Sequence, residues 1–320
     1  MDNLVNNANM AVPEGVITKQ MFMEAPNNAV MNGLVLIRSY TEKPTSNGTS
    51  TYLYGTAEGV GSMPFKVWSG KTLQDMKQND YTGKICEVKV SVNEYNGVRS
   101  LIIESLTPYK GTNYKQSDFL EKKYDADELW TTMLNVIAKN CSQEACDIFK
   151  LIIKPIEERF KTEFAAINHH DNCVNGLLAH TTKVVRISQI IKFYPVLQDA
   201  VTNDVLIIGC ALHDIGKVLE YNMGNISEQG KILNHLTLGL TMIMDKRDDI
   251  VRLKNEEFYN TLLSVVQQHH GEYGERPKTL AAYIVHLIDS MEAKLTDASE
   301  AVEAATGDTI KCEDFYLRFK

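Results

Sequence analysis

All eight histidines of this 320-residue chain lie after residue 168, in or beside segments whose apolar spacing predicts helices. His180 shares a predicted helical face with apolar residues three positions before it and four positions after it, so its side chain should be buried. His213 is followed at once by Asp214 at the end of the apolar run VLIIGCAL, and Asp289 lies within another predicted helix. Imidazole and carboxylate groups therefore recur on inward-facing positions.

Each of these residues taken singly has an ordinary structural explanation, because a lone histidine on an apolar face usually packs in the core and His213-Asp214 could cap a helix. However, burying an unpaired carboxylate costs several kcal/mol, so a group of them needs a compensating charge. Imidazole with carboxylate is a ligand set for Mn, Fe, Zn, Ni or Co. Asp214 could bridge two ions about 3.5–4 Å apart, which together activate a water and clamp a phosphodiester.

The order His, His-Asp, His, His-His, Asp in a helical region resembles the HD-domain superfamily of metal-dependent phosphohydrolases. The resemblance implies that four of these residues hold a first metal ion and that the additional histidines hold a second. It also implies that Asp214 is a catalytic residue that bridges both ions. The implied ligands are His180, His213, Asp214, His235, one or both of His269 and His270, and Asp289.

Other polar residues near these motifs are candidates for contacts with substrate. Lys217 matches the lysine of the HDIGK form, which implies a catalytic lysine that contacts phosphate. His286 is either an orienting residue behind a ligand or Asp289, or an ordinary core histidine. The remaining candidates are the pair His169 and His170, expected at the mouth of the site unless they are a simple loop pair, and Arg276 and Lys278 of the loop 271–278.

Residues 30–107 read as β structure, with short runs rich in Val, Leu, Ile and Tyr separated by turn residues. Asn96-Gly97 between two alternating runs is the strongest short-range signal for a hairpin. We expect a short helix between the third and fourth strands, and five strands with a helix after the third is the order of an OB-fold. After residue 128 the apolar period changes from two to 3.6.

We therefore expect a multidomain α and β chain: an N-terminal five-stranded OB-fold β-barrel followed by an all-α HD-domain helical bundle. The expected boundaries are a flexible N-terminus at 1–14, the OB-fold at 15–108, a linker at 109–125 and the phosphohydrolase domain at 126–320.

The resemblance extends to one family, the YhaM-type 3′→5′ exoribonucleases, over roughly residues 15 to 320. It is carried by NHHDNCVNGLLAHTTKVV, ALHDIGKVLEY, GKILNHLTLG, HHGEYGERPKTLAAYIVHLIDSMEAK and FYLRFK, with the barrel in front. The family implies hydrolysis of single-stranded RNA, or of single-stranded DNA, from the 3′ end to nucleoside monophosphates. It implies two divalent ions, Mn²⁺ first, with Fe, Ni, Co, Zn or Mg as alternatives. The segment YGER is shorter than the family pattern, and DSMEAK replaces DNLDAK.

An OB-fold binds single strands by stacking bases on aromatic rings and by tracking phosphates with Lys and Arg. Residues 1–110 carry 10 basic and 10 acidic residues, so only a modest salt dependence of binding is expected. The pattern does not decide which face each side chain occupies. The candidates are Arg38, Tyr40, Tyr54, Lys66 and Trp68.

Two other functions fit the same residues. The metal site could act on nucleotides or cyclic (di)nucleotides, for which the short 271–278 loop leaves room. The chain could also be a scaffold that binds single strands with an inactive HD domain, although every expected ligand position is filled. We expect a cytoplasmic protein without a membrane partner, because the six cysteines are scattered and the sequence shows neither a signal peptide nor a long apolar run. A homo-oligomer is a candidate assembly.

Overall fold

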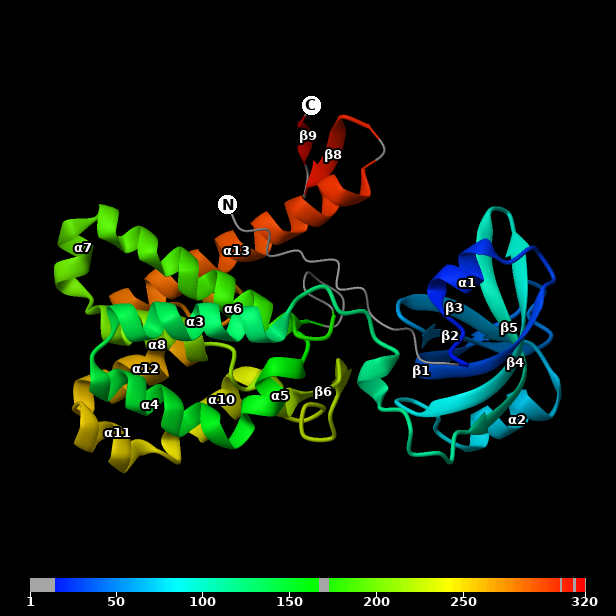
Figure 1. Ribbon diagram of the computed structural model, residues 1–320, viewed down its shortest axis with the longest axis horizontal. Helices are drawn as coiled ribbons and strands as arrows, with labels where there is room; N and C mark the ends of the chain where they lie inside the picture. The colour runs from blue at the N-terminus through cyan, green and yellow to red at the C-terminus, as the bar shows by residue number, and fades with distance from the viewer. Residues whose placement is uncertain (1–14, 167–172, 306, 313–314, 320) are drawn as a thin grey trace. The chain divides into compact units, whose positions relative to one another are not determined.

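A computed structural model describes residues 15–166, 173–305, 307–312 and 315–319 (Figure 1). The chain divides between Lys122 and Lys123 into two compact units. None of the helices in this described part of the chain is long and apolar enough to cross a membrane.

The first unit contains a closed barrel with the strand order β1-β2-β3-β5-β4. The neighbouring strands are antiparallel except β3 and β5, which run parallel. A helix lies between β3 and β4 in the chain, so the prediction of a five-stranded OB-type barrel is confirmed. The elements are α1 (Lys19–Glu24), β1 (Val30–Pro44), β2 (Thr51–Glu58), β3 (Ser62–Val67), α2 (Gly70–Gln78), β4 (Ile85–Tyr95) and β5 (Val98–Pro108).

The barrel core follows from alternation along the strands. On β3, Phe65 and Val67 are fully buried while Lys66 between them is not, because successive strand residues point to opposite faces. The predicted hairpin joins β4 to β5, where Asn96 and Gly97 both adopt positive φ angles, as a two-residue turn of this kind requires.

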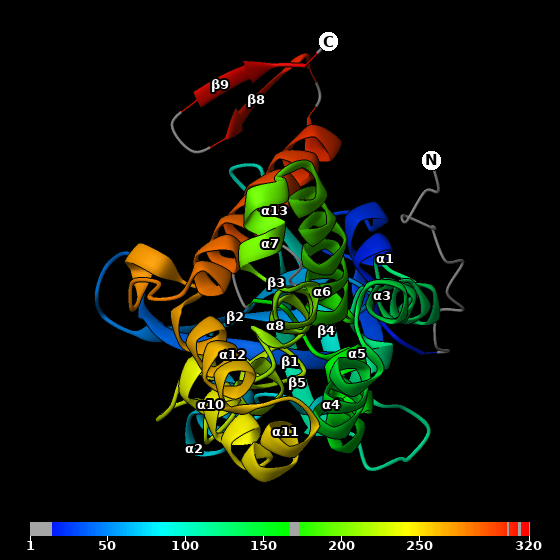
Figure 2. The ribbon, with the colours of Figure 1, turned by 90° about the vertical axis from the view of Figure 1, so that its left-hand side faces the viewer.

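The second unit is built mainly of helices, and α8 lies at its centre. Every residue of α8 from Val205 to Leu212 is buried, because the helix is apolar on all sides and packs against α4, α6, α12 and α13 (Figure 2). Its helices are α3 (Ala126–Asn140), α4 (Gln143–Ile153), α5 (Glu157–Thr162), α6 (Gly176–Ile187), α7 (Pro195–Ala200), α8 (Asn203–Leu212), α9 (Lys217–Glu220), α10 (His235–Met244), α11 (Arg247–Leu253), α12 (Glu256–Gln268) and α13 (Leu280–Ala304). Its 3-10 turns are η2 (Lys154–Ile156), η3 (Ser188–Phe193) and η4 (Gly271–Tyr273). A further 3-10 turn, η1 (Gln116–Asp118), belongs to the first unit.

This unit also contains two short hairpins that the helical periodicity did not predict. The first joins β6 (Tyr221–Asn222) to β7 (Asn225–Ile226) through Met223 and Gly224, both at positive φ. The second pairs β8 (Thr309–Cys312) with β9 (Phe315–Arg318) after the end of α13. Strands of two to four residues are too short for an alternation pattern to reveal them.

Candidate metal centre

The central helix α8 delivers His213 and Asp214 to the interior of the helical unit. His213 and Asp214 are both buried, directly after the last apolar turn of the helix. Gly216 then allows the chain to pass close to α10, since a methyl group on this residue would overlap the carbonyl oxygen of His235. The glycine of HDIGK therefore brings the doublet and His235 together.

A first group of ligand atoms comes from α6, α8 and α13. The Nε2 atom of His180 lies 3.2 Å from Nε2 of His213 and 3.1 Å from Oδ1 of Asp289. His213 Nε2 lies 3.7 Å from the same Asp289 oxygen. Together these atoms surround one point that a cation could occupy.

A second group is formed by Asp214, His235, His269 and His270. The Nε2 atoms of His235 and His270 are 3.1 Å apart. Asp214 Oδ1 lies 3.5 Å from Nε2 of His269 and 3.7 Å from Nε2 of His235. The two neighbouring histidines at the end of α12 thus belong to the same group.

Asp214 stands between the two groups, with one carboxylate oxygen toward each. Its Oδ2 atom lies 3.4 Å from Nε2 of both His180 and His213, whereas Oδ1 faces the second group. Oδ1 is buried and makes no hydrogen bond to any described residue. A buried carboxylate oxygen without a hydrogen bond, among converging imidazole nitrogens, fits a site for divalent cations.

The histidines are held from behind, through their Nδ1 atoms. His180 donates to Glu292 at 2.5 Å, and His235 donates to Glu220 at 2.7 Å. His213 and His269 donate to backbone carbonyl oxygens three residues earlier in the chain. Each of these bonds holds the proton on Nδ1 and directs Nε2 at the centre, which is the orientation that a metal ligand requires once Nε2 carries no proton.

The two glutamates of this supporting layer were not predicted from the sequence. Glu292 follows Asp289 by one helical turn, and Glu220 lies one turn after Lys217. Both positions could have been recognised as facing the same way as a predicted site residue, but their partners are 112 and 15 positions away in the chain. The Nδ1 atom of His286 donates to the backbone carbonyl oxygen of His269 at 2.7 Å.

In the first group, the histidines and carboxylates favour each other's charged forms. Burial disfavours the charged form of His180, but hydrogen bonds to Asp289 and Glu292 outweigh it and raise its pKa to about 10. Burial also opposes protonation of His213, and Asp214 raises its pKa to about 9. The pKa values of Asp214 and Asp289 lie well below the ordinary range despite burial. Lys217 and His213 favour the charged form of Asp214, and His180 and His213 favour that of Asp289.

In the second group, the pKa values of two histidines are lowered instead of raised. Burial lowers the pKa of His269, and burial together with the neighbouring His269 and His235 lowers that of His270 to about 4. His270 is therefore neutral at physiological pH, which leaves its nitrogen available as a ligand.

Lys217 is placed at the centre, and its Nζ atom lies 2.6 Å from Asp214 Oδ2. Arg276 and Lys278 lie on the exposed segment before α13, where Lys278 pairs with Glu275. His169 and His170 lie outside the described residues.

On the barrel, one outward face collects most of the predicted binding residues. Strand pairing places Tyr54 opposite Lys66 and next to the exposed Trp68, which stacks on Tyr52 with ring centroids 4.4 Å apart. Lys43 lies over the Tyr54 ring, and Arg38 lies further along β1.

Tyr40 lies apart from this face. Its hydroxyl lies 3.0 Å from the carbonyl oxygen of Asn79 and accepts a hydrogen bond from the backbone of Tyr81. Because β1 pairs Tyr40 with the buried Gly55, its ring fixes α2 to the barrel and does not join the outward aromatic pair.

Comparison with known proteins identifies the region around the centre. Residues 177–294 match the HD domain family. The chain is 27% identical over 280 residues to the 3'-5' exoribonuclease YhaM of Bacillus subtilis (strain 168), and this match covers 84% of this chain and 86% of that protein. It is 29% identical over 287 residues to the protein of the same name from Geobacillus sp. (strain WCH70), covering 84% of each.

A solved structure of the mitochondrial single-stranded DNA binding protein Rim1 from S. cerevisiae matches 28% of this chain and 100% of that chain. Its sequence identity is 16% and its TM-score is 0.24, a likeness too weak to bear on function.

Proposed function

We propose that this chain, an HD-domain protein that resembles the YhaM-type exoribonucleases along most of its length, is a metal-dependent 3′→5′ exonuclease acting on single strands. One observation carries the proposal. The carboxylate of Asp214 lies between two groups of histidine nitrogens, with one oxygen toward each. A buried carboxylate shared in this way could hold two ions close enough to act on one phosphodiester.

Seven residues would hold the divalent ions. His180, His213 and Asp289 would bind one, and His235, His269 and His270 the other, with Asp214 shared. When bound, the ions would supply Lewis acidity and a nucleophilic water. We propose Mn²⁺ as the native ion, as the resemblance to the YhaM-type family implies, with Fe, Ni, Co, Zn and Mg as alternatives. The imidazole and carboxylate ligands suit several divalent transition metals.

The chain's own residues would bind and orient the substrate. Lys217 is paired to Asp214 at the edge of the centre, so its ammonium can contact a phosphate oxygen while it keeps Asp214 ionised. Glu292 and Glu220 fix the orientation of His180 and His235. Arg276 and Lys278, exposed before α13, and the predicted pair His169 and His170 are the proposed further contacts to phosphate.

We propose that residues 15–108 form a nucleic-acid-binding domain and residues 126–320 the phosphohydrolase domain. The outward barrel face supports this, because the Tyr52–Trp68 stack and Tyr54 offer flat rings to bases while Lys43 and Lys66 offer charge to phosphates. Stacking is tolerant of sequence and does not need a surplus of positive charge. The proposed partner is single-stranded RNA, with single-stranded DNA second.

The proposal is tested with 5′-labelled single-stranded RNA, pure protein and a titration of Mn²⁺. We expect a descending ladder of labelled products and no ladder with Asp214→Asn, whereas Glu228→Gln, which changes an exposed carboxylate, retains activity. Equal shortening by wild type and Asp214→Asn would contradict the proposal. Turnover of mononucleotides or cyclic dinucleotides without turnover of RNA would favour the second enzymatic function. RNA binding with less than one bound metal ion per chain would favour a scaffold.

A further inference from the structure

The helix α13 carries an exposed apolar stripe along its whole length. Leu280, Leu287, Leu295 and Val302 are each between 37% and 59% exposed, and Met291 in the middle is partly exposed. At about 100° per residue, all five lie within about 40° of one direction on the helix. An apolar stripe of this length on a helix surface is typical of a face that another helix covers.

The stripe is symmetric about Met291. Leu287 and Leu295 stand four residues to either side, and Leu280 and Val302 stand eleven residues to either side. If two copies of α13 cross antiparallel at Met291, Leu287 of each copy meets Leu295 of the other, and Leu280 meets Val302. The same surface then serves both partners, which is the requirement of a two-fold interface.

Charge at the two ends of the helix complements the same pairing. The last ten residues of α13 contain Asp297, Glu300 and Glu303 and no Lys or Arg. Carboxylates at the C-terminal end of a helix oppose its dipole, and Glu300 is paired to Lys123. An antiparallel partner would bring the exposed Arg276 and the positive N-terminal end of its helix to this acidic end.

The hairpin after α13 also presents apolar side chains to solvent. Phe315, Tyr316 and Leu317 of β9 are all exposed, while Ile310 of β8 is buried. A two-stranded hairpin is only marginally stable by itself in water. Figure 1 shows β8 and β9 at the C-terminal end of α13, so an antiparallel partner would carry its hairpin to the N-terminal end.

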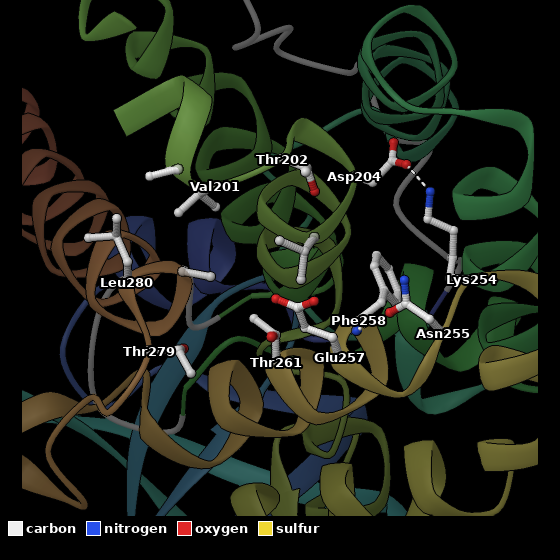
Figure 3. Close-up of a pocket in the computed structure, with 13 residues that line it drawn as sticks. Val201, Thr202, Asp204, Lys254, Asn255, Glu257, Phe258, Thr261, Thr279 and Leu280 are labelled. Carbon is white, nitrogen blue, oxygen red and sulfur yellow. Dashed lines mark hydrogen bonds and ion pairs between the residues drawn. The ribbon is translucent and has the colours of Figure 1, made fainter. Parts of the chain in front are cut away.

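A cavity of about 410 Å³ lies at that N-terminal end. Figure 3 shows Leu280 and Val201 on one side of it and the ion pair of Asp204 with Lys254 on the other. Its apolar side is continuous with the stripe through Leu280. The cavity therefore offers a seat for the apolar side chains of a partner's hairpin.

We propose that the α13 stripe is a two-fold interface between two copies of this chain, with α13 antiparallel to its counterpart and the β8–β9 hairpin of each copy against the cavity of the other. The assembly is independent of what the metal centre does.

The first test is the mass in solution by light scattering. We expect at least twice the 36.0 kDa of one chain, and we expect the double variant Leu287→Glu, Leu295→Glu to halve the mass. Ile232→Glu is the control, because Ile232 is an exposed apolar residue outside the stripe. A wild-type mass of one chain, or an unchanged mass in the double variant, would overturn the interface.

The second test uses cysteines and a short bis-maleimide in a background with Cys141→Ser and Cys312→Ser. Met291→Cys should cross-link to itself, because this position alone lies on the two-fold axis. Leu280→Cys should not, since its two copies would be about 33 Å apart along the helices. A mixture of Leu280→Cys with Val302→Cys should cross-link again. Efficient cross-linking of Leu280→Cys alone would show a parallel arrangement and reject the proposal.

Discussion

His180 and Glu292 are joined by a 2.5 Å contact between Nδ1 and Oε2, and both side chains are buried. The carboxylate is itself held in place, because Thr296 donates to its other oxygen at 2.6 Å and Lys183 lies 3.2 Å from that oxygen. This network sets the ring of His180 with Nε2 toward Asp289 and Asp214.

The first prediction concerns this pair. Glu292→Gln keeps the shape of the side chain but removes the charge that favours the Nδ1–H form of His180. We expect metal affinity to fall about 10- to 100-fold, measured by calorimetry, because partners behind a ligand typically contribute that much. Glu300→Gln changes a more exposed carboxylate on the same helix and should leave metal affinity unchanged. Equal affinities in the two variants would remove this role from Glu292.

Gly216 provides a second prediction. A methyl group at this position would overlap the His235 carbonyl oxygen and crowd the backbone of Gly239, so α10 must move away from the metal centre. We expect Gly216→Ala to destabilise the fold by about 1–3 kcal/mol, as overpacking does, and to weaken binding of one metal ion more than the other. Thermal unfolding and metal stoichiometry measure these effects.

The control for that experiment is Gly307→Ala, since a methyl group there would meet open space. A Gly216→Ala protein with wild-type melting temperature and two bound ions would contradict the packing argument.

A third prediction concerns protons. The pKa values of His180 and His213 are raised to about 10 and about 9, so both rings are charged at neutral pH before metal binds. Because a ligand nitrogen must lose its proton, metal binding should release protons at pH 7 and tighten as pH rises toward 9. Calorimetry in buffers of different ionisation enthalpy measures the release. Identical binding enthalpies in all buffers would show that no proton leaves.

The same shifts predict the pH dependence of the metal-free fold. Raised histidine pKa values mean that the folded state binds protons more tightly than the unfolded chain, so this stabilisation is complete below pH 6.5 and is lost as pH rises through about 9 to 10. The melting temperature in the presence of a chelator should therefore fall between pH 7 and pH 10. A metal-bound sample should show a smaller decrease over this range.

The fourth prediction tests the barrel face. Trp68→Ala should lower affinity for a single-stranded RNA about 5- to 150-fold, which corresponds to about 1–3 kcal/mol for one stacked base. Tyr95→Ala is the control, because Tyr95 is an exposed aromatic residue at the β4–β5 turn and not on the face of Tyr52 and Trp68. Fluorescence anisotropy gives both affinities, and equal losses would indicate a different binding face.

Much of this protein could be predicted from local sequence patterns. The apolar run of α8 predicted a buried helix that ends at His213-Asp214, and alternation with Asn96-Gly97 predicted the barrel hairpin. These features depend on which residues face the core along one helix or strand, and a period of 3.6 or two records that directly.

The tertiary structure decided which polar groups meet. The partnership of His180 with Glu292, the two-sided position of Asp214 and the inward turn of Tyr40 depend on how separate helices and strands pack. The same is true of the exposed stripe on α13, whose periodicity alone fits a face buried in its own unit. Sequence spacing specifies the direction of a side chain relative to its own helix or strand, whereas its neighbours depend on long-range packing that no local pattern contains.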